Sequence, residues 1–145
     1  MKNILVTVEF ESQLDKLISK AKEFANKYNA KLWLLHVAAP DPDFVGYEVG
    51  PTYIRESRAN ELRQEHRLLD NYVKSLENEG LEADGLLIQG ATAQTILEEA
   101  EKLKCEMIII GHHSHSWFYK IFGQPTDFEV IDKTNIPVLI VPIHY

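Results

Sequence analysis

Short apolar runs alternate with helix-type segments along the whole of this 145-residue chain. The first run, 3–8 (NILVTV), is followed by a segment in which apolar residues recur every three or four positions, the spacing of one helix face. The alternation then repeats until a last apolar run at 137–141. Strands that read as apolar throughout, each followed by a helix, are typical of a parallel sheet covered on both faces. We therefore predict one α/β domain over residues 1–145, with a doubly wound five-stranded parallel sheet in the order 3-2-1-4-5.

The element boundaries follow from periodicity and from capping signals. Thr92 or a neighbour is expected to cap the third helix, and Gly80 is expected to end the second. Segment 38–51 holds three prolines and two glycines, so we expect a long functional loop there. Strands are predicted at 3–8, 31–37, 86–88, 107–110 and 137–141, and helices from Ser12 to Tyr28, over 52–79, from residue 92 and over 126–133.

The composition excludes some classes of binding partner but does not identify one. A net charge of −7 and a pI near 5.3 argue against a nucleic-acid or anionic-membrane surface, which needs Lys and Arg to displace counterions. The net charge does not argue against a small anionic ligand, because a local cluster of backbone N–H groups can hold it. Cys105 is the one cysteine and can form no internal disulfide, so we expect a reducing, cytoplasmic location. No apolar run is long enough to predict a membrane span.

Motifs for nucleophilic catalysis are missing from the sequence. It contains no G-x-S-x-G, no phosphate-loop lysine motif and no C-x-x-C, so we do not expect an enzyme. A hydrolase that uses Glu9 and His113 is kept as an alternative. His112, His113 and His115 are interpreted as a polar loop with His112 facing water, and no metal is assigned. His36 and His66 are interpreted as a strand residue and a helix-surface residue.

The predicted strand order creates a crevice. The chain reverses direction across the sheet between strands 1 and 4, so the loops after Val8 and after Ile110 face each other where open α/β sheets bind ligands.

Several segments, in their order and spacing, resemble the universal stress protein family over essentially the whole chain. They are 4–8 (ILVTV) followed by a carboxylate, 34–37 (LLHV), Gly90 before the third helix, 108–113 (IIIGHH) and 136–142 (IPVLIVP). The resemblance implies a small cytoplasmic α/β domain, usually a homodimer, linked to survival under stress. It also implies that the protein falls into either a nucleotide-binding or a non-binding branch.

The binding branch carries G-x2-G-x9-G-[ST] after strand 4, where glycines let the loop wrap a triphosphate. Laid on that motif without gaps, this chain keeps Gly111 and has Ser114, Gln124 and Pro125 at the other positions. A slip of one residue would supply Gly123 as the third glycine. Pro125 removes a backbone donor where phosphates would dock. After strand 1 the family's Asp is replaced by Glu9, and the bulkier Phe10 follows.

Two functions remain open at this point. The first is a homodimeric stress-response module that acts by protein association, with no cofactor and an unknown protein partner. The alternative is an ATP- or AMP-binding protein, because segment 38–51 looks like that of members with an intact motif, whereas 111–120 resembles the non-binding branch. The candidate nucleotide crevice comprises Val8, Glu9, Val37, Gly111, His113, Ser114, Gly123, Gln124 and Thr126.

The last strand carries the predicted dimer contact. In the resembling family strand 5 often pairs with its partner's strand 5, and an unpaired apolar edge here would be open to other strands. The predicted contact residues are Val138, Leu139, Ile140 and Val141. The aromatic residues 117–119 are expected either to dock a partner or to fold over the crevice.

Overall fold

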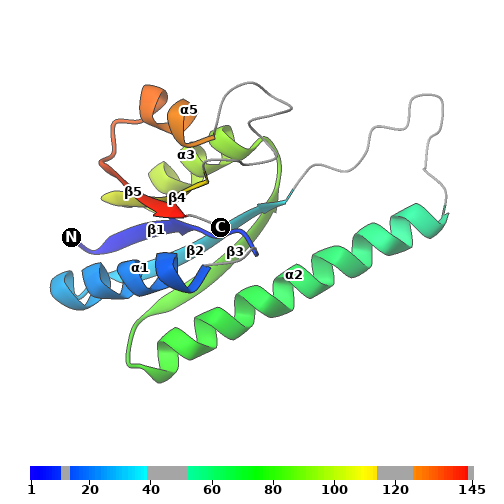
Figure 1. Cartoon of the computed structure of the whole chain (residues 1–145), viewed down its shortest axis with the longest axis horizontal. Helices are drawn as coiled ribbons and strands as arrows, with labels where there is room; N and C mark the ends of the chain where they lie inside the picture. Colours follow the sequence, from blue (N-terminus) through cyan, green and yellow to red (C-terminus); the bar gives the residue numbers. More distant parts are fainter. Residues whose placement is uncertain (11–13, 39–51, 114–125, 144–145) are drawn as a thin grey trace.

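Strands and helices alternate in the computed structural model, which describes residues 1–10, 14–38, 52–113 and 126–143 (Figure 1). The strands join one parallel sheet in the order β3-β2-β1-β4-β5, which confirms the predicted class and strand order. The elements are β1 (Asn3–Thr7), α1 (Leu14–Tyr28), β2 (Lys31–Ala38), α2 (Thr52–Asn78), β3 (Ala83–Gln89), α3 (Thr92–Lys102), β4 (Met107–His113), α5 (Thr126–Lys133) and β5 (Val138–Ile143).

The central strand β1 sets the register of the sheet. On one side Thr7 pairs with Leu35 of β2, and on the other Val6 pairs with Ile109 of β4. The backbone N–H of Val8 continues the first ladder by donating to the Leu35 carbonyl at 2.8 Å. The ends of β1 and β4 therefore lie side by side where the strand order reverses, as predicted.

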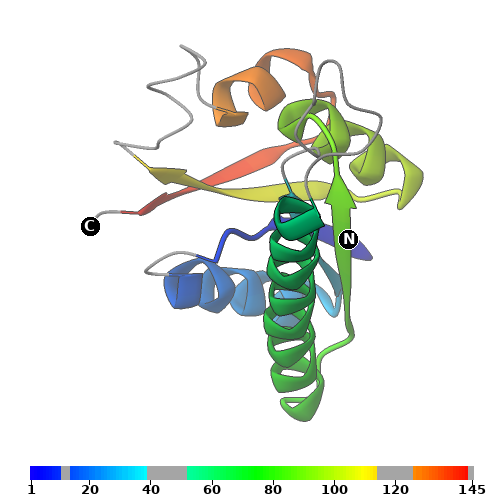
Figure 2. The same ribbon diagram turned by 90° about the vertical axis from the view of Figure 1, so that its right-hand side faces the viewer.

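Alternate residues of the strands feed two separate apolar cores. Ile4 and Val6 of β1 belong to the core that α1 and α2 cover, whereas Leu5 belongs to the core beneath α3 and α5. The two pairs of helices lie on opposite faces of the sheet in Figures 1 and 2. This alternation is the side-chain geometry of a pleated strand, with successive residues pointing to opposite faces.

Helix α2 packs directly on the backbone of β3. A Cβ atom at Gly85 would lie 2.9 Å from Cγ of Leu69, closer than real Cβ contacts, and 3.2 Å from Cγ2 of Val73, which is a tight contact. Leu69 is 2% exposed, so the helix approaches the strand where the strand has no side chain. The amino-terminal end of α2 extends past the carboxyl end of β2 (Figure 1).

Three helices end in the same way. At the end of α2, Gly80 takes φ +87° and the Leu81 N–H donates to the Leu76 carbonyl at 3.1 Å, the pattern of a Schellman motif. Gly80 therefore follows the end of α2, as predicted. Asn29 after α1 (φ 52°) and Lys104 after α3 (φ 54°) hold the equivalent left-handed positions.

One strand boundary was wrong, and one expected cap has no side-chain hydrogen bond. Strand β3 covers Ala83–Gln89 rather than 86–88, because Asp84 and Gly85 interrupt the apolar run although they pair with β2. Helix α3 begins at Thr92, as predicted, and its cap position is the neighbouring Ala91, which has no side-chain acceptor to offer. The expected start of α1 at Ser12 lies outside the described residues. No helix in the described ranges is long and apolar enough to cross a membrane.

Candidate functional site

Four of the predicted crevice residues lie at the carboxyl end of the sheet. Val8 and Gly111 each lie two positions beyond the paired residues Val6 and Ile109, and Val8 is 2% exposed. Val37, near the end of β2, is half-buried and pairs with Ile88. Glu9 follows Val8 and is exposed. Parallel strands bring these residues to one edge, as the topology predicted.

The remaining predicted crevice residues are known only in part. His113 ends β4 in register with Ile143, and Thr126 begins α5, but their side chains are outside the described set. Ser114, Gly123 and Gln124, together with Pro125, His115, the aromatic residues 117–119 and the 39–51 segment, also lie outside the described residues. The assignment of a degenerate phosphate loop therefore stays a prediction from sequence.

His112 differs from its predicted environment. The sequence predicts that the His112 side chain faces water. In the structure it is half-buried on β4, and its ring centroid lies 6.0 Å from that of Phe128 on α5. The difference arises because β4 continues through His113, so His112 belongs to the sheet rather than to a loop.

A histidine contact that sequence reasoning missed lies beside Val8. The Nδ1 atom of His36, on β2, is 2.8 Å from the Val8 carbonyl oxygen, and its Nε2 atom is 3.2 Å from Oε2 of Glu65 on α2. The ring of Phe10 lies against the imidazole, with 4.7 Å between centroids. His36 thus connects the end of β1 to the long helix.

Burial distinguishes this contact from the His66–Asp70 pair within α2. The side chains of His36 and Glu65 are 12% and 26% exposed, whereas those of His66 and Asp70 are 61% and 49% exposed. Two sequence signals could have identified it: His36 is a polar residue within the apolar run of β2, and Glu65 lies four residues before the buried Leu69.

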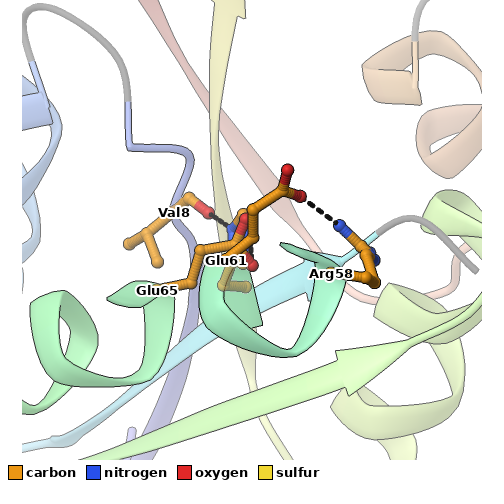
Figure 3. A network of polar contacts seen from close by, with 5 residues as sticks. Val8, Arg58, Glu61 and Glu65 are labelled. Carbon is orange, nitrogen blue, oxygen red and sulfur yellow. Dashed lines mark hydrogen bonds and ion pairs between the residues drawn. The ribbon is translucent and has the colours of Figure 1, made fainter. Parts of the chain in front are cut away.

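The inward face of α2 changes character along its length. Near β3 it presents Leu69 and Val73, whereas towards the crevice it presents Glu65 and the poorly exposed side chain of Arg58. An Arg58 guanidinium nitrogen (Nη1) lies 3.1 Å from Oε2 of Glu61. Figure 3 shows these three charged side chains of α2 together with Val8, with Arg58 on the side of Glu61 away from Val8. Polar groups therefore border the carboxyl end of the sheet on this side.

The described residues hold no activated nucleophile at this edge. Both nitrogens of the His36 ring already face oxygen atoms, so neither nitrogen is available to act as a base or to bind a metal. Cys105 lies two residues before β4, at the opposite end of that strand, and burial followed by the nearby Glu106 raises the pKa of its thiol to about 11. Nowhere in the described ranges do three potential ligands from His, Cys, Asp and Glu gather in a metal-binding group.

Comparison with known proteins agrees with the fold. A model of the universal stress protein family matches residues 1–142 of the chain. Universal stress protein C of Escherichia coli O6:H1 is 28% identical over 143 residues, covering 97% of this chain and 95% of that protein. Universal stress protein UspA from Lactobacillus plantarum superimposes with a TM-score of 0.78 at 16% identity, covering 97% of each chain. The universal stress protein from Archaeoglobus fulgidus in complex with dAMP gives a TM-score of 0.63 at 21% identity, again covering 97% of each chain. With the family model matching nearly its full length, this chain belongs to the universal stress protein family.

Proposed function

We propose that this protein is a homodimeric, cytoplasmic stress-response module that acts by associating with another protein, and that its crevice no longer grips a triphosphate. One observation carries the proposal: of the positions of the family's phosphate-binding motif, the chain keeps Gly111 and carries Ser114, Gln124 and Pro125 at the others. Side chains replace the bare backbone there, and proline removes an N–H donor. The proposal includes no catalytic step.

Nucleotide binding is the second candidate, and the fold favours it. Val8, Val37 and Gly111 lie at one end of the sheet, at the strand reversal where nucleotides bind in such folds. The Archaeoglobus fulgidus relative was solved in complex with dAMP. In this candidate the crevice residues hold the base and ribose, and the altered loop holds the phosphates.

Calorimetry with the purified protein separates the two candidates. We expect no heat of binding when ATP with magnesium is titrated into the natural chain. The matched variant restores the motif through Ser114→Gly, Gln124→Gly and Pro125→Ser, and we expect it to gain binding. Micromolar affinity of the natural chain for ATP would refute the first candidate and establish the second.

The dimer part of the proposal concerns β5. This strand is at one end of the sheet order, and Val138, Leu139 and Ile140 are half-buried in the single chain while Val141 is 6% exposed. A second copy that pairs with this edge would cover these side chains and supply partners for the edge backbone.

Light scattering tests the predicted contact. Leu139→Asp and Ile140→Asp, each checked for native circular dichroism, should yield monomers. Ile88→Asp is the matched control, because it places the same charge at a half-buried site on the opposite edge strand β3, and it should leave the dimer intact. Folded Leu139→Asp and Ile140→Asp chains that stay dimeric would place the contact elsewhere.

A further inference from the structure

Alternate residues of β5 supply the backbone groups of its outer edge. The Ile108 N–H donates to the Pro137 carbonyl at 3.0 Å, and Ile108 is in register with Val138. The N–H and C=O groups of successive strand residues point to opposite sides, so residues an even number of positions from Pro137 face β4. The backbone groups of Val138, Ile140 and Pro142 therefore point away from β4, to the outer edge.

Both ends of this edge are closed by the chain itself. Pro142 has no N–H to donate, and its carbonyl accepts a hydrogen bond from Nζ of Lys16 on α1 at 2.8 Å. At the start of the strand, the Ile136 N–H donates to the Thr134 hydroxyl at 2.9 Å, and that hydroxyl lies 3.5 Å from the Ile136 carbonyl oxygen. The two outward residues between these closed ends keep N–H and C=O groups that have no partner among the described residues.

A second copy of this chain matches the edge in one register. When two β5 strands run antiparallel with Leu139 opposite Leu139, Val138 of each copy faces Ile140 of the other, and each pair can exchange both of its N–H···O hydrogen bonds. Ile136 then faces Pro142, so one closed residue meets another. The side chains agree with this register, because Leu139 meets its counterpart on the face of the α1–α2 core and Val138 meets Ile140 on the opposite face.

Other pairings leave backbone groups unmatched. Centring the antiparallel pair on Ile140 sets the open groups of Val138 against Pro142, and centring it on Val138 sets those of Ile140 against Ile136. A strand of another protein brings open N–H and C=O groups to the positions opposite both ends, unless it is closed at the same places. Backbone groups left unpaired in an interface cost free energy, so the edge favours its own copy.

We propose that the closed ends of β5, made by Thr134 at one end and by Lys16 with Pro142 at the other, direct this edge to pair antiparallel with a second copy of this chain. The pair is centred on Leu139. This register rests on the dimer of the proposed function, and it adds the alignment of the two strands and the residues that set it.

Disulfide cross-linking measures the register. Directly opposite residues of a non-hydrogen-bonded antiparallel pair have Cα atoms about 4.5 Å apart, whereas diagonal neighbours are about 7–8 Å apart. A disulfide needs about 4.4–6.8 Å. In a Cys105→Ala background, Leu139→Cys should therefore oxidise to a covalent dimer about tenfold or more faster than the control variants Val138→Cys and Ile140→Cys. A pair centred on Ile140 would reverse this preference.

Opening one closed end tests what sets the register. Lys16→Ala frees the carbonyl at position 142, and Pro142→Ala adds an N–H there. Pairing centred on Ile140 then gains hydrogen bonds, so with both changes the cross-linking of Ile140→Cys should rise relative to that of Leu139→Cys. Lys20→Ala is the matched control, because Lys20 is also on α1 but pairs with Glu23, and it should leave the preference unchanged.

The possible results separate the register from the dimer. If light scattering finds the natural chain monomeric, the dimer of the proposed function fails and the register fails with it. If the chain is dimeric but Leu139→Cys does not cross-link fastest, the dimer stands and the register is refuted. A preference that Lys16→Ala with Pro142→Ala leaves unchanged would refute the role of the closed end.

Discussion

Replacing Gly85 by alanine tests the closest contact between α2 and the sheet. The added methyl group would lie 2.9 Å from Cγ and 3.1 Å from Cδ2 of Leu69, and 3.2 Å from Cγ2 of Val73. Cγ of Leu69 is a branch point near the helix backbone and Leu69 is buried, so relief requires a shift of the helix. Overpacking of this kind costs about 1–3 kcal/mol. Alanine has less conformational freedom than glycine in the unfolded chain, and this effect stabilises the folded protein by about 0.4–1 kcal/mol. We therefore expect Gly85→Ala to lower the free energy of unfolding by about 1–2 kcal/mol.

A double-mutant cycle isolates this contact. Leu69→Ala alone should cost about 2–5 kcal/mol, because it empties a buried site. In that background Gly85→Ala no longer meets the Leu69 side chain but still meets Cγ2 of Val73 at 3.2 Å, so it should cost clearly less than in the natural chain. Urea unfolding followed by circular dichroism, at one fixed protein concentration, measures all four proteins. If Gly85→Ala is as stable as the natural chain, or costs as much with Leu69→Ala as without it, the contact argument is refuted.

Three further predictions concern titration and surface charge. Cys105 should resist alkylation at pH 8 in the folded protein and react once the chain is unfolded, because burial raises its thiol pKa from 9.0 to about 11. The neutral thiol stabilises the folded state fully below about pH 9 and loses this effect as the pH rises toward 11; equal alkylation of both states would contradict this. The pKa of Tyr72 is raised, first by burial and then by Asp15, so Asp15→Asn should lower it in an NMR titration. Lys22→Ala should cost less than about 1 kcal/mol in urea unfolding, because its pair with Glu79 is largely exposed; a larger loss would reveal a coupling not apparent in the fold.

The fold could be predicted from the sequence because the central strands carry apolar side chains on both faces of the sheet. Residues such as Ile4, Leu5 and Val6 supply two cores at once, which leaves a parallel sheet between helices as the matching arrangement. Errors occurred where this reasoning does not apply. The edge strand β3 carries Asp84 and Gly85 near its start: Asp84 is exposed and pairs with Lys31, and Gly85 has no side chain where Leu69 of α2 packs on the strand.

The candidate site was predictable in its position and less so in its contacts. Strand order alone brings Val8 and Gly111 to one edge, because parallel strands end together. The contact of His36 with Glu65 joins residues far apart in the sequence, and it depends on the angle at which α2 crosses the sheet. Periodicity identifies the inward face of a helix but not the partner opposite each position, so the sequence indicates only a strand residue at His36.

The central place of β1 has a consequence for synthesis. The first 89 residues contain the strands of one half of the sheet, β1, β2 and β3, which can pair as they leave the ribosome. The other edge of β1 then waits for β4, whose pairing partners begin at Met107. During this interval a nascent chain presents an unpaired, apolar strand edge, so the intermediate most exposed to wrong pairing and to chaperone capture is the one in which β3 has left the ribosome while β4 is still inside it.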